Sequence, residues 1–158
     1  MTATPLPEDV SLLLTALTAW SQAEVMDQLA AAGFGDLRVS HGYVFQHLQA
    51  GPITVRDLAE AMGVTAQAAS KSTGELERLG YVTRSQGADL RVRLIELTNA
   101  GHQAILAARI ARAGTNAEMR LKLGDGDDAD RFARSLRTLA ETTGALEALA
   151  NRRLRLIG

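Results

Sequence analysis

The fold is decided by residues 54–101, which read TVRDLAEAMGVTAQAASKSTGELERLGYVTRSQGADLRVRLIELTNAG. The first half holds two segments with the apolar spacing of a helix. Each starts at a threonine, Thr54 or Thr65, whose hydroxyl can accept a hydrogen bond from the first turn. Gly63 interrupts the pattern between them and Gly80 ends the second segment, because glycine readily adopts the left-handed backbone that stops a helix. Two short helices joined by a tight turn predict a helix-turn-helix motif.

The second of these helices, residues 65–79, has the two faces that a helix in the major groove of DNA needs. Its apolar and small residues can turn inward, which leaves Gln67, Ser70 and Lys71 outward, and Thr65 at the helix start is placed to meet a phosphate. Gln can pair with adenine, Ser with a base or a phosphate, and Lys with guanine or a phosphate. An ordinary amphipathic helix with a solvated polar face explains the same pattern, so the helix alone does not decide between the two.

The rest of the chain is predicted to be mainly helical. β-forming residues at 81–84 and about 90–97 predict one hairpin, with its turn at 85–89. Helices are predicted on both sides from apolar periodicity, caps and glycines, over residues 8–32, 40–49 with Ser40 as the cap, 98–123 with Thr98 as the cap, and 128–154.

Positive charge is concentrated on the predicted hairpin. Arg91 and Arg93 alternate onto one side of the second strand, and Arg84 lies on the first strand. Such a wing can place an arginine in the minor groove of DNA, whereas the alternative is an exposed edge strand protected by its charges. Asp89 argues against that alternative, because a carboxylate at the hairpin tip can accept hydrogen bonds from Arg91 or the turn backbone and fix the shape of the wing.

At this point the sequence resembles the MarR family of multiple-antibiotic-resistance-type regulators. The resemblance is carried by strings in the family's order and spacing: Gly63-Val64-Thr65, LERLGYVTR at 76–84, DLRVR at 89–93 and LTNAG at 97–101. It implies a winged helix-turn-helix that binds double-stranded DNA and is flanked by long N- and C-terminal dimerisation helices. The residues that the resemblance assigns to the recognition helix are Thr65, Gln67, Ser70 and Lys71. It also implies that Arg91 enters the minor groove and that Asp89 stabilises the wing.

The predicted recognition helix departs from the family pattern at three consecutive positions. Ser72 and Thr73 stand where aliphatic residues are usual, and Gly74 stands where a charged residue is frequent. Glycine inside a helix costs up to about 1 kcal/mol relative to alanine, so this helix should be less stable than is typical. The preferred DNA sequence is accordingly the least predictable property of the chain.

The resemblance implies a single domain over 1–158, with a DNA-binding lobe at 38–98 and dimerisation helices at 1–37 and 99–158. A homodimer would present two recognition helices about 34–36 Å apart, which suits a pseudo-palindromic operator and a repressor. Apolar residues on the terminal helices are the candidates for the dimer contact, although they could instead complete the core of one monomer. These residues are Val10, Leu13, Leu14, Leu17, Trp20, Ile105, Leu106, Ile110, Leu136, Leu139, Leu146, Leu149, Leu154, Leu156 and Ile157.

A pocket for a small aromatic ligand is a further implication of the resemblance. Trp20, His41 and Phe45 are candidates for its lining, with His41 the best single candidate for a polar contact. Core packing is the alternative for each of them, because aromatic side chains normally fill cores.

Composition excludes several other functions. The chain has 158 residues and no cysteine, so it has no disulfide, no thiolate metal site and no cysteine nucleophile. No stretch approaches the roughly 20 apolar residues that span a bilayer, and we expect a cytoplasmic protein. The chain has no nucleophile elbow, dinucleotide fingerprint or phosphate-binding loop, so we expect no enzyme, no cofactor and no metal site.

The net charge of −1 is unusual for a protein that binds nucleic acid. Residues 1–37 contain no lysine or arginine, however, so an acidic beginning masks a more basic remainder. The main alternative is a winged-helix protein-interaction module that does not bind an operator.

Overall fold

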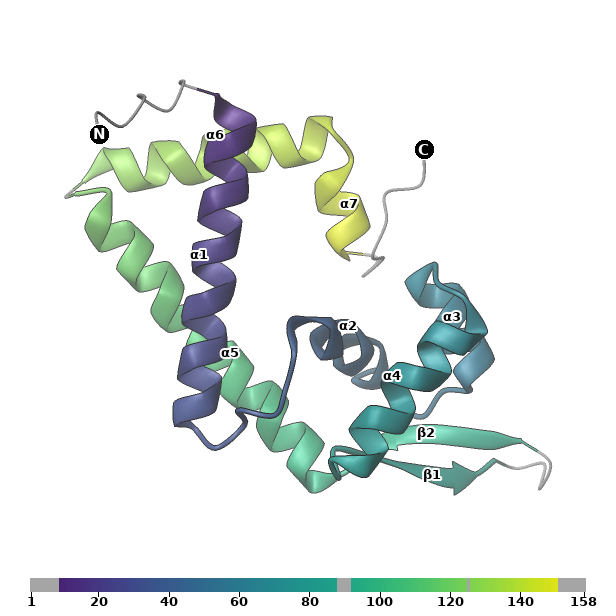
Figure 1. The fold of residues 1–158 in the computed structure, drawn as a ribbon. Helices are drawn as coiled ribbons and strands as arrows, with labels where there is room; N and C mark the ends of the chain where they lie inside the picture. The colour runs from purple at the N-terminus through teal and green to yellow at the C-terminus, as the bar shows by residue number, and fades with distance from the viewer. Residues whose placement is uncertain (1–8, 88–91, 125, 151–158) are drawn as a thin grey trace, which may run out of the picture.

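The computed structural model describes residues 9–87, 92–124 and 126–150 (Figure 1). The elements in chain order are α1 (Val10–Ala31), α2 (Val39–Leu48), α3 (Val55–Met62), α4 (Ala66–Arg78), β1 (Val82–Gln86), β2 (Arg93–Leu97), α5 (Asn99–Lys122), α6 (Asp127–Thr142) and α7 (Ala145–Ala150). The two strands form an antiparallel sheet. The predicted class, mainly helical with a two-stranded wing, is confirmed.

Helices α2, α3 and α4 and the two strands, here called the winged-helix lobe, surround one apolar core. Val44 from α2, Leu58 from α3, Leu76 from α4 and Ile95 from β2 are buried there almost completely. The backbone of Ile95 also exchanges two hydrogen bonds with Ile53, at 2.8 and 3.1 Å, which ties the segment before α3 to the outer edge of β2. Helices and wing therefore share a single packed unit (Figure 1).

Three threonines begin helices as the sequence predicts. Thr54 and Thr65 accept hydrogen bonds from the backbone N–H groups of Asp57 and Ala68, which fixes the start of α3 and of α4. Thr98 accepts from the Gly101 N–H at 3.2 Å, and its hydroxyl donates to the Gly80 carbonyl at 2.7 Å. Thr98 therefore joins the start of α5 to the turn between α4 and β1.

The predicted cap at Ser40 is wrong. Helix α2 begins at Val39, with Arg38 in the cap position. The Arg38 backbone N–H donates to the ring Nδ1 of His41 at 3.2 Å, which is the hydrogen bond that the third helical residue makes to the cap residue in a capping box.

Two other boundaries differ from prediction. Strand β1 extends to Gln86, and the Gly87 N–H donates to the Val92 carbonyl at 2.9 Å, so cross-strand pairing continues into the predicted turn. The single helix predicted over 128–154 is instead divided, because Gly144, with φ of +73°, separates α6 from α7. The Thr143 hydroxyl donates to the Leu139 carbonyl at 2.8 Å, so it gives a partner to a carbonyl in the last turn of α6.

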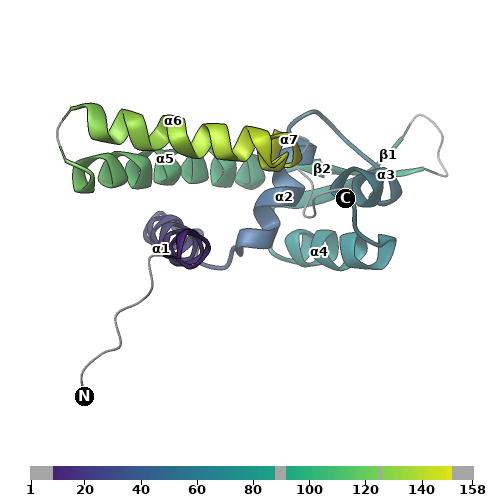
Figure 2. The ribbon, with the colours of Figure 1, turned by 90° about the horizontal axis from the view of Figure 1, so that it is seen from above.

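The terminal helices are arranged differently from the lobe. Helix α1 packs along α5, and α6 turns away from the end of α5 (Figures 1 and 2). Within α6, Ala129 is the single buried residue. Among the helices in the described ranges, none is both long and apolar enough to cross a membrane.

Candidate nucleic-acid interface and adjoining cavity

Helix α4 presents a polar row opposite its buried face. Ala69, Thr73 and Leu76 are buried, and they follow the i, i+4, i+7 spacing of one helix side. The residues predicted to read DNA from this helix are all exposed: Thr65, Gln67, Ser70 and Lys71. The structure thus brings these four side chains to the solvent side of α4.

The unusual residues of α4 are accommodated in two ways. Thr73 is buried, but its hydroxyl donates to the Ala69 carbonyl at 2.9 Å, so the polar group has a partner inside the lobe. Gly74 has no neighbouring atom within 4 Å of the position that a Cβ would occupy, and its φ is not positive. Neither close packing nor backbone conformation therefore requires glycine at this position.

The wing carries Arg84 and Arg93 on one face. Arg84 lies opposite Ile95 and Gln86 lies opposite Arg93, so the two arginines occupy neighbouring positions of the same side. The Arg84 Nε donates to a carboxylate oxygen of Glu77 on α4 at 2.8 Å. Arg93 is exposed and makes no ion pair within the described part of the chain. Arg91 and Asp89, the predicted minor-groove residue and wing stabiliser, lie outside the described residues.

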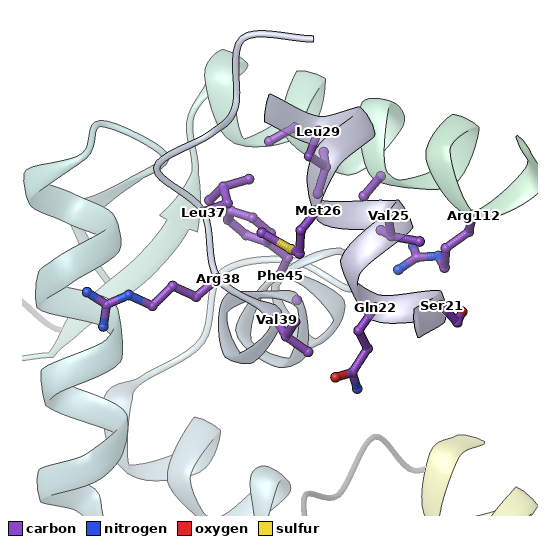
Figure 3. A pocket seen from close by; sticks show the side chains of 13 residues that line it. Ser21, Gln22, Val25, Met26, Leu29, Leu37, Arg38, Val39, Phe45 and Arg112 are labelled. Carbon is purple, nitrogen blue, oxygen red and sulfur yellow. The ribbon is translucent and has the colours of Figure 1, made fainter. Parts of the chain in front are cut away.

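A cavity of about 190 Å³ lies between α1, α2 and α5 (Figure 3). Its wall is mainly apolar and consists of Ser21, Gln22, Val25, Met26, Leu29, Leu37, Arg38, Val39, Gly42, Phe45, Ala104, Ala108 and Arg112. Of the three predicted ligand contacts, Phe45 belongs to this wall, whereas Trp20 and His41 do not.

His41 is committed to contacts elsewhere. Its side chain is buried, its Nδ1 accepts the Arg38 backbone N–H, and its Nε2 lies 3.4 Å from a carboxylate oxygen of Glu75 on α4. The ring therefore joins α2 to α4 behind the cavity wall.

Arg112 is one of the lining residues that the sequence did not predict. It follows Ala104 and Ala108 at intervals of four, so all three lie on one side of α5, and it makes no ion pair within the described residues. Two small residues followed by an arginine at this spacing are the sequence pattern from which this part of the wall could have been predicted. Arg38 also contributes to the wall, but its guanidinium points away from the cavity (Figure 3).

Tyr81 connects the cavity wall with the wing. Its ring meets Phe45 edge-on, with centroids 6.0 Å apart, and its hydroxyl donates to Asp36 at 2.6 Å. Burial, followed by the hydrogen bond to Asp36 and the negative charge of that carboxylate, raises the pKa of Tyr81 to about 12. The phenol therefore remains a hydrogen-bond donor throughout the neutral range.

The fold and these surfaces define a winged helix-turn-helix protein with long flanking helices. Residues 36–91 match the model of the MarR family. None of the curated proteins matches the sequence significantly. This match confirms the resemblance to the MarR family over residues 36–91, and similar solved structures share the fold.

Three of those structures are informative. YusO from Bacillus subtilis is 24% identical, with a TM-score of 0.69 over 89% of this chain and 99% of that one. A mutant of MepR from Staphylococcus aureus, bound to an oligodeoxyribonucleotide, is 20% identical, with a TM-score of 0.58 over 87% and 98%. CouR from Rhodococcus jostii RHA1, bound to p-coumaroyl-CoA, is 22% identical, with a TM-score of 0.60 over 85% and 91%. At these identities the likeness establishes the fold.

Proposed function

We propose that this protein is a transcriptional regulator, and specifically a repressor, that binds a pseudo-palindromic operator as a homodimer. The observation that carries the proposal is the exposed row Gln67, Ser70 and Lys71 on α4, directly opposite the buried face of that helix. A helix anchored in this way can enter the major groove with its polar side toward the bases. The similar MepR structure, bound to an oligodeoxyribonucleotide, is consistent with this use of the fold.

The wing supplies the second set of contacts in this proposal. Arg93 is exposed and unpaired within the described residues, and it can reach a phosphate or the minor groove. Arg84 is held by Glu77, so we assign it to joining the wing to α4 as well as to contacting the DNA backbone. Arg91 and Asp89 keep the roles that the family resemblance implies.

Dimer formation is supported by apolar side chains that the monomer leaves in solvent. They lie on helices outside the lobe and include Val10, Leu13, Leu17, Leu106, Ile110, Leu136, Leu139 and Leu149. A monomer seldom exposes so much apolar surface on neighbouring helices, and a second copy would cover it. Ile105, also considered for this contact, is instead buried in the core of the monomer.

A small aromatic acid is the effector that the cavity favours. A volume of about 190 Å³ is slightly more than the roughly 150 Å³ known to hold benzene in an engineered apolar cavity. The wall offers apolar side chains for a ring, and the guanidinium of Arg112 is available for a carboxylate. We propose that such a ligand releases the protein from its operator; the p-coumaroyl-CoA in the similar CouR structure carries an aromatic group of related size.

DNA binding is tested first with the wild-type chain, by footprinting the DNA that flanks its own gene. Fluorescence anisotropy on the protected fragment, at fixed salt, then compares Gln67→Ala and Lys71→Ala with Lys122→Ala, which removes the same charge from the far end of α5. We expect the α4 variants to lose about tenfold in affinity, as for a lost base contact of 1–3 kcal/mol, and Lys122→Ala to lose less than twofold.

The salt dependence separates DNA binding from the alternative of a protein-interaction module. Several phosphate contacts give a steep decline of affinity with salt, and Lys71→Ala should lower that slope by about one. Arg91→Ala should also weaken binding while leaving the oligomer intact. A slope near zero, or equal affinity for all variants, would favour the interaction module.

A further inference from the structure

Three side chains join the recognition helix to the first turn of α2. The Glu75 carboxylate on α4 lies 2.9 Å from Nη2 of Arg38, and its second oxygen lies 3.4 Å from Nη1 of the same guanidinium. That second oxygen also lies 3.4 Å from Nε2 of His41. Arg38 is the cap residue of α2 and His41 lies in its first turn, so one carboxylate of α4 holds that turn at two points.

His41 and Glu75 are the less exposed members of this cluster. His41 is 1% exposed, and its Nδ1 accepts the Arg38 N–H, which leaves Nε2 as the ring nitrogen that lies beside Glu75. The Glu75 side chain is 20% exposed and the Arg38 side chain 67%. An ion pair this open to water adds little stability, so its main effect is to fix how α4 is oriented relative to α2.

The opposite side of the same turn forms part of the cavity. Leu37, Arg38, Val39 and Gly42 all belong to the cavity wall. Anything that fills the cavity therefore presses on the residues whose other side holds Glu75. The recognition helix and the cavity share one element, the beginning of α2.

We propose that Glu75 is a positioning residue that transmits occupancy of the cavity to the recognition helix. With the cavity empty, Arg38 and His41 hold Glu75 and keep α4 at the angle that DNA requires. An occupant displaces the first turn of α2, these contacts weaken, and α4 leaves that angle. The inference rests on the proposed function, because it explains how an effector would release DNA.

The first test separates positioning from simple charge. Removing a carboxylate beside DNA reduces repulsion of the phosphates, so electrostatics alone predicts that Glu75→Gln binds DNA more tightly. The positioning role predicts the opposite, a three- to tenfold loss of affinity for the protected fragment. Glu60→Gln, an exposed residue of α3 that loses the same charge, should bind as well as the wild type or better.

A double variant tests whether the loss of DNA affinity depends on the contact between Glu75 and Arg38. If both residues act in one contact, the double variant Arg38→Ala, Glu75→Gln should bind no more weakly than the weaker single variant. The thermal midpoint and the sedimentation of Glu75→Gln should stay close to those of the wild type, which excludes unfolding as the cause.

The coupling to the cavity can be tested without an effector. Gly42 lines the cavity and has nothing within 4 Å of the position of an added Cβ, so Gly42→Leu places a side chain in the cavity. We expect at least a fivefold loss of DNA affinity in the wild-type background and less than twofold when Glu75→Gln is already present. Ser40→Leu, an exposed residue in the same turn of α2, serves as the control and should change affinity less than twofold.

Failure of the inference and failure of the proposed function give different results. A wild-type chain that binds no DNA overturns both. A wild-type chain that binds normally, with Glu75→Gln equal to or tighter than it, overturns the inference alone. Equal losses from Gly42→Leu in both backgrounds also overturn it, because the cavity would then act on α4 by another route.

Discussion

In the winged-helix lobe, Leu58 and Leu76 have no exposed surface, whereas Val10 on α1 and Ile110 on α5 keep 62% and 65% of theirs. Both regions are helical and rich in leucine, so composition does not account for the difference. The lobe closes around a core that its helices, the wing and the first half of α5 enclose from several sides. The terminal helices lie against one another along single faces, and their remaining apolar faces lack a cover within the described chain. The contrast indicates that the lobe is complete in one copy and that the terminal helices are not.

The largest expected effect on the free energy of unfolding comes from removing a buried side chain of the lobe. Leu76→Ala removes a fully buried side chain and should lower the free energy of unfolding by about 2–5 kcal/mol, measured by urea denaturation. Val39→Ala, at a residue that is 42% exposed in the same lobe, should cost less than about 1 kcal/mol. The ratio of the two effects should not depend on protein concentration. Equal costs would show that the lobe is loosely packed. The lobe would then not differ from the terminal helices in the way described above.

An intermediate effect is expected on the terminal helices. Leu136 and Leu139 lie three apart on α6 and are both exposed, so replacing both with aspartate places two charges on the face that we assign to the dimer. We expect the dimer dissociation constant to rise about 100-fold, or about 2.7 kcal/mol, in sedimentation equilibrium. The circular dichroism of the lobe should be retained. The matched change Thr138→Asp, on an exposed and already polar position of α6, should leave the constant within a few-fold.

The smallest effect concerns the recognition helix itself. Gly74→Ala should raise the free energy of unfolding by up to about 1 kcal/mol, because alanine is the better helix former and an added Cβ meets no atom within 4 Å. Gly114→Ala on α5 is the contrasting case, since its Cβ would lie 2.9 Å from the Gln28 side-chain oxygen, and we expect it to gain less or to lose stability. A lower free energy of unfolding for Gly74→Ala would show that α4 needs the flexibility of glycine. The DNA affinity of the same variant would then show whether that flexibility is needed for binding.

Local signals in the sequence predicted the lobe well. Thr54, Thr65 and Thr98 each begin a helix through a hydrogen bond made within a few residues, so neighbouring residues suffice to predict them. The start of α2 differs from the prediction because Arg38, which is not a usual cap residue, takes the cap position and its backbone N–H donates to the His41 ring. The break at Gly144 was missed because the apolar period continues on both sides of it.

The site could be predicted in part. Exposure of Gln67, Ser70 and Lys71 follows from helical period alone. The cavity does not, because its wall joins residues of α1, α2 and α5 that are far apart in the sequence. His41 looked like a ligand contact since histidine is scarce and polar, but the ring faces α4 and is fully occupied there.

The ion pairs of α4 bear on the conflict between a net charge of −1 and the DNA binding that we propose. Each acidic side chain of the helix, Glu75 and Glu77, is matched by an arginine from a neighbouring element, Arg38 or Arg84. Each such pair largely neutralises itself, so the charge over the exposed side of α4 comes from cations without an ion pair in the described residues, Lys71 and Arg78 on α4 and Arg93 on the wing. An overall negative chain can thus present a locally cationic surface, whose counterions are released into solution when DNA arrives.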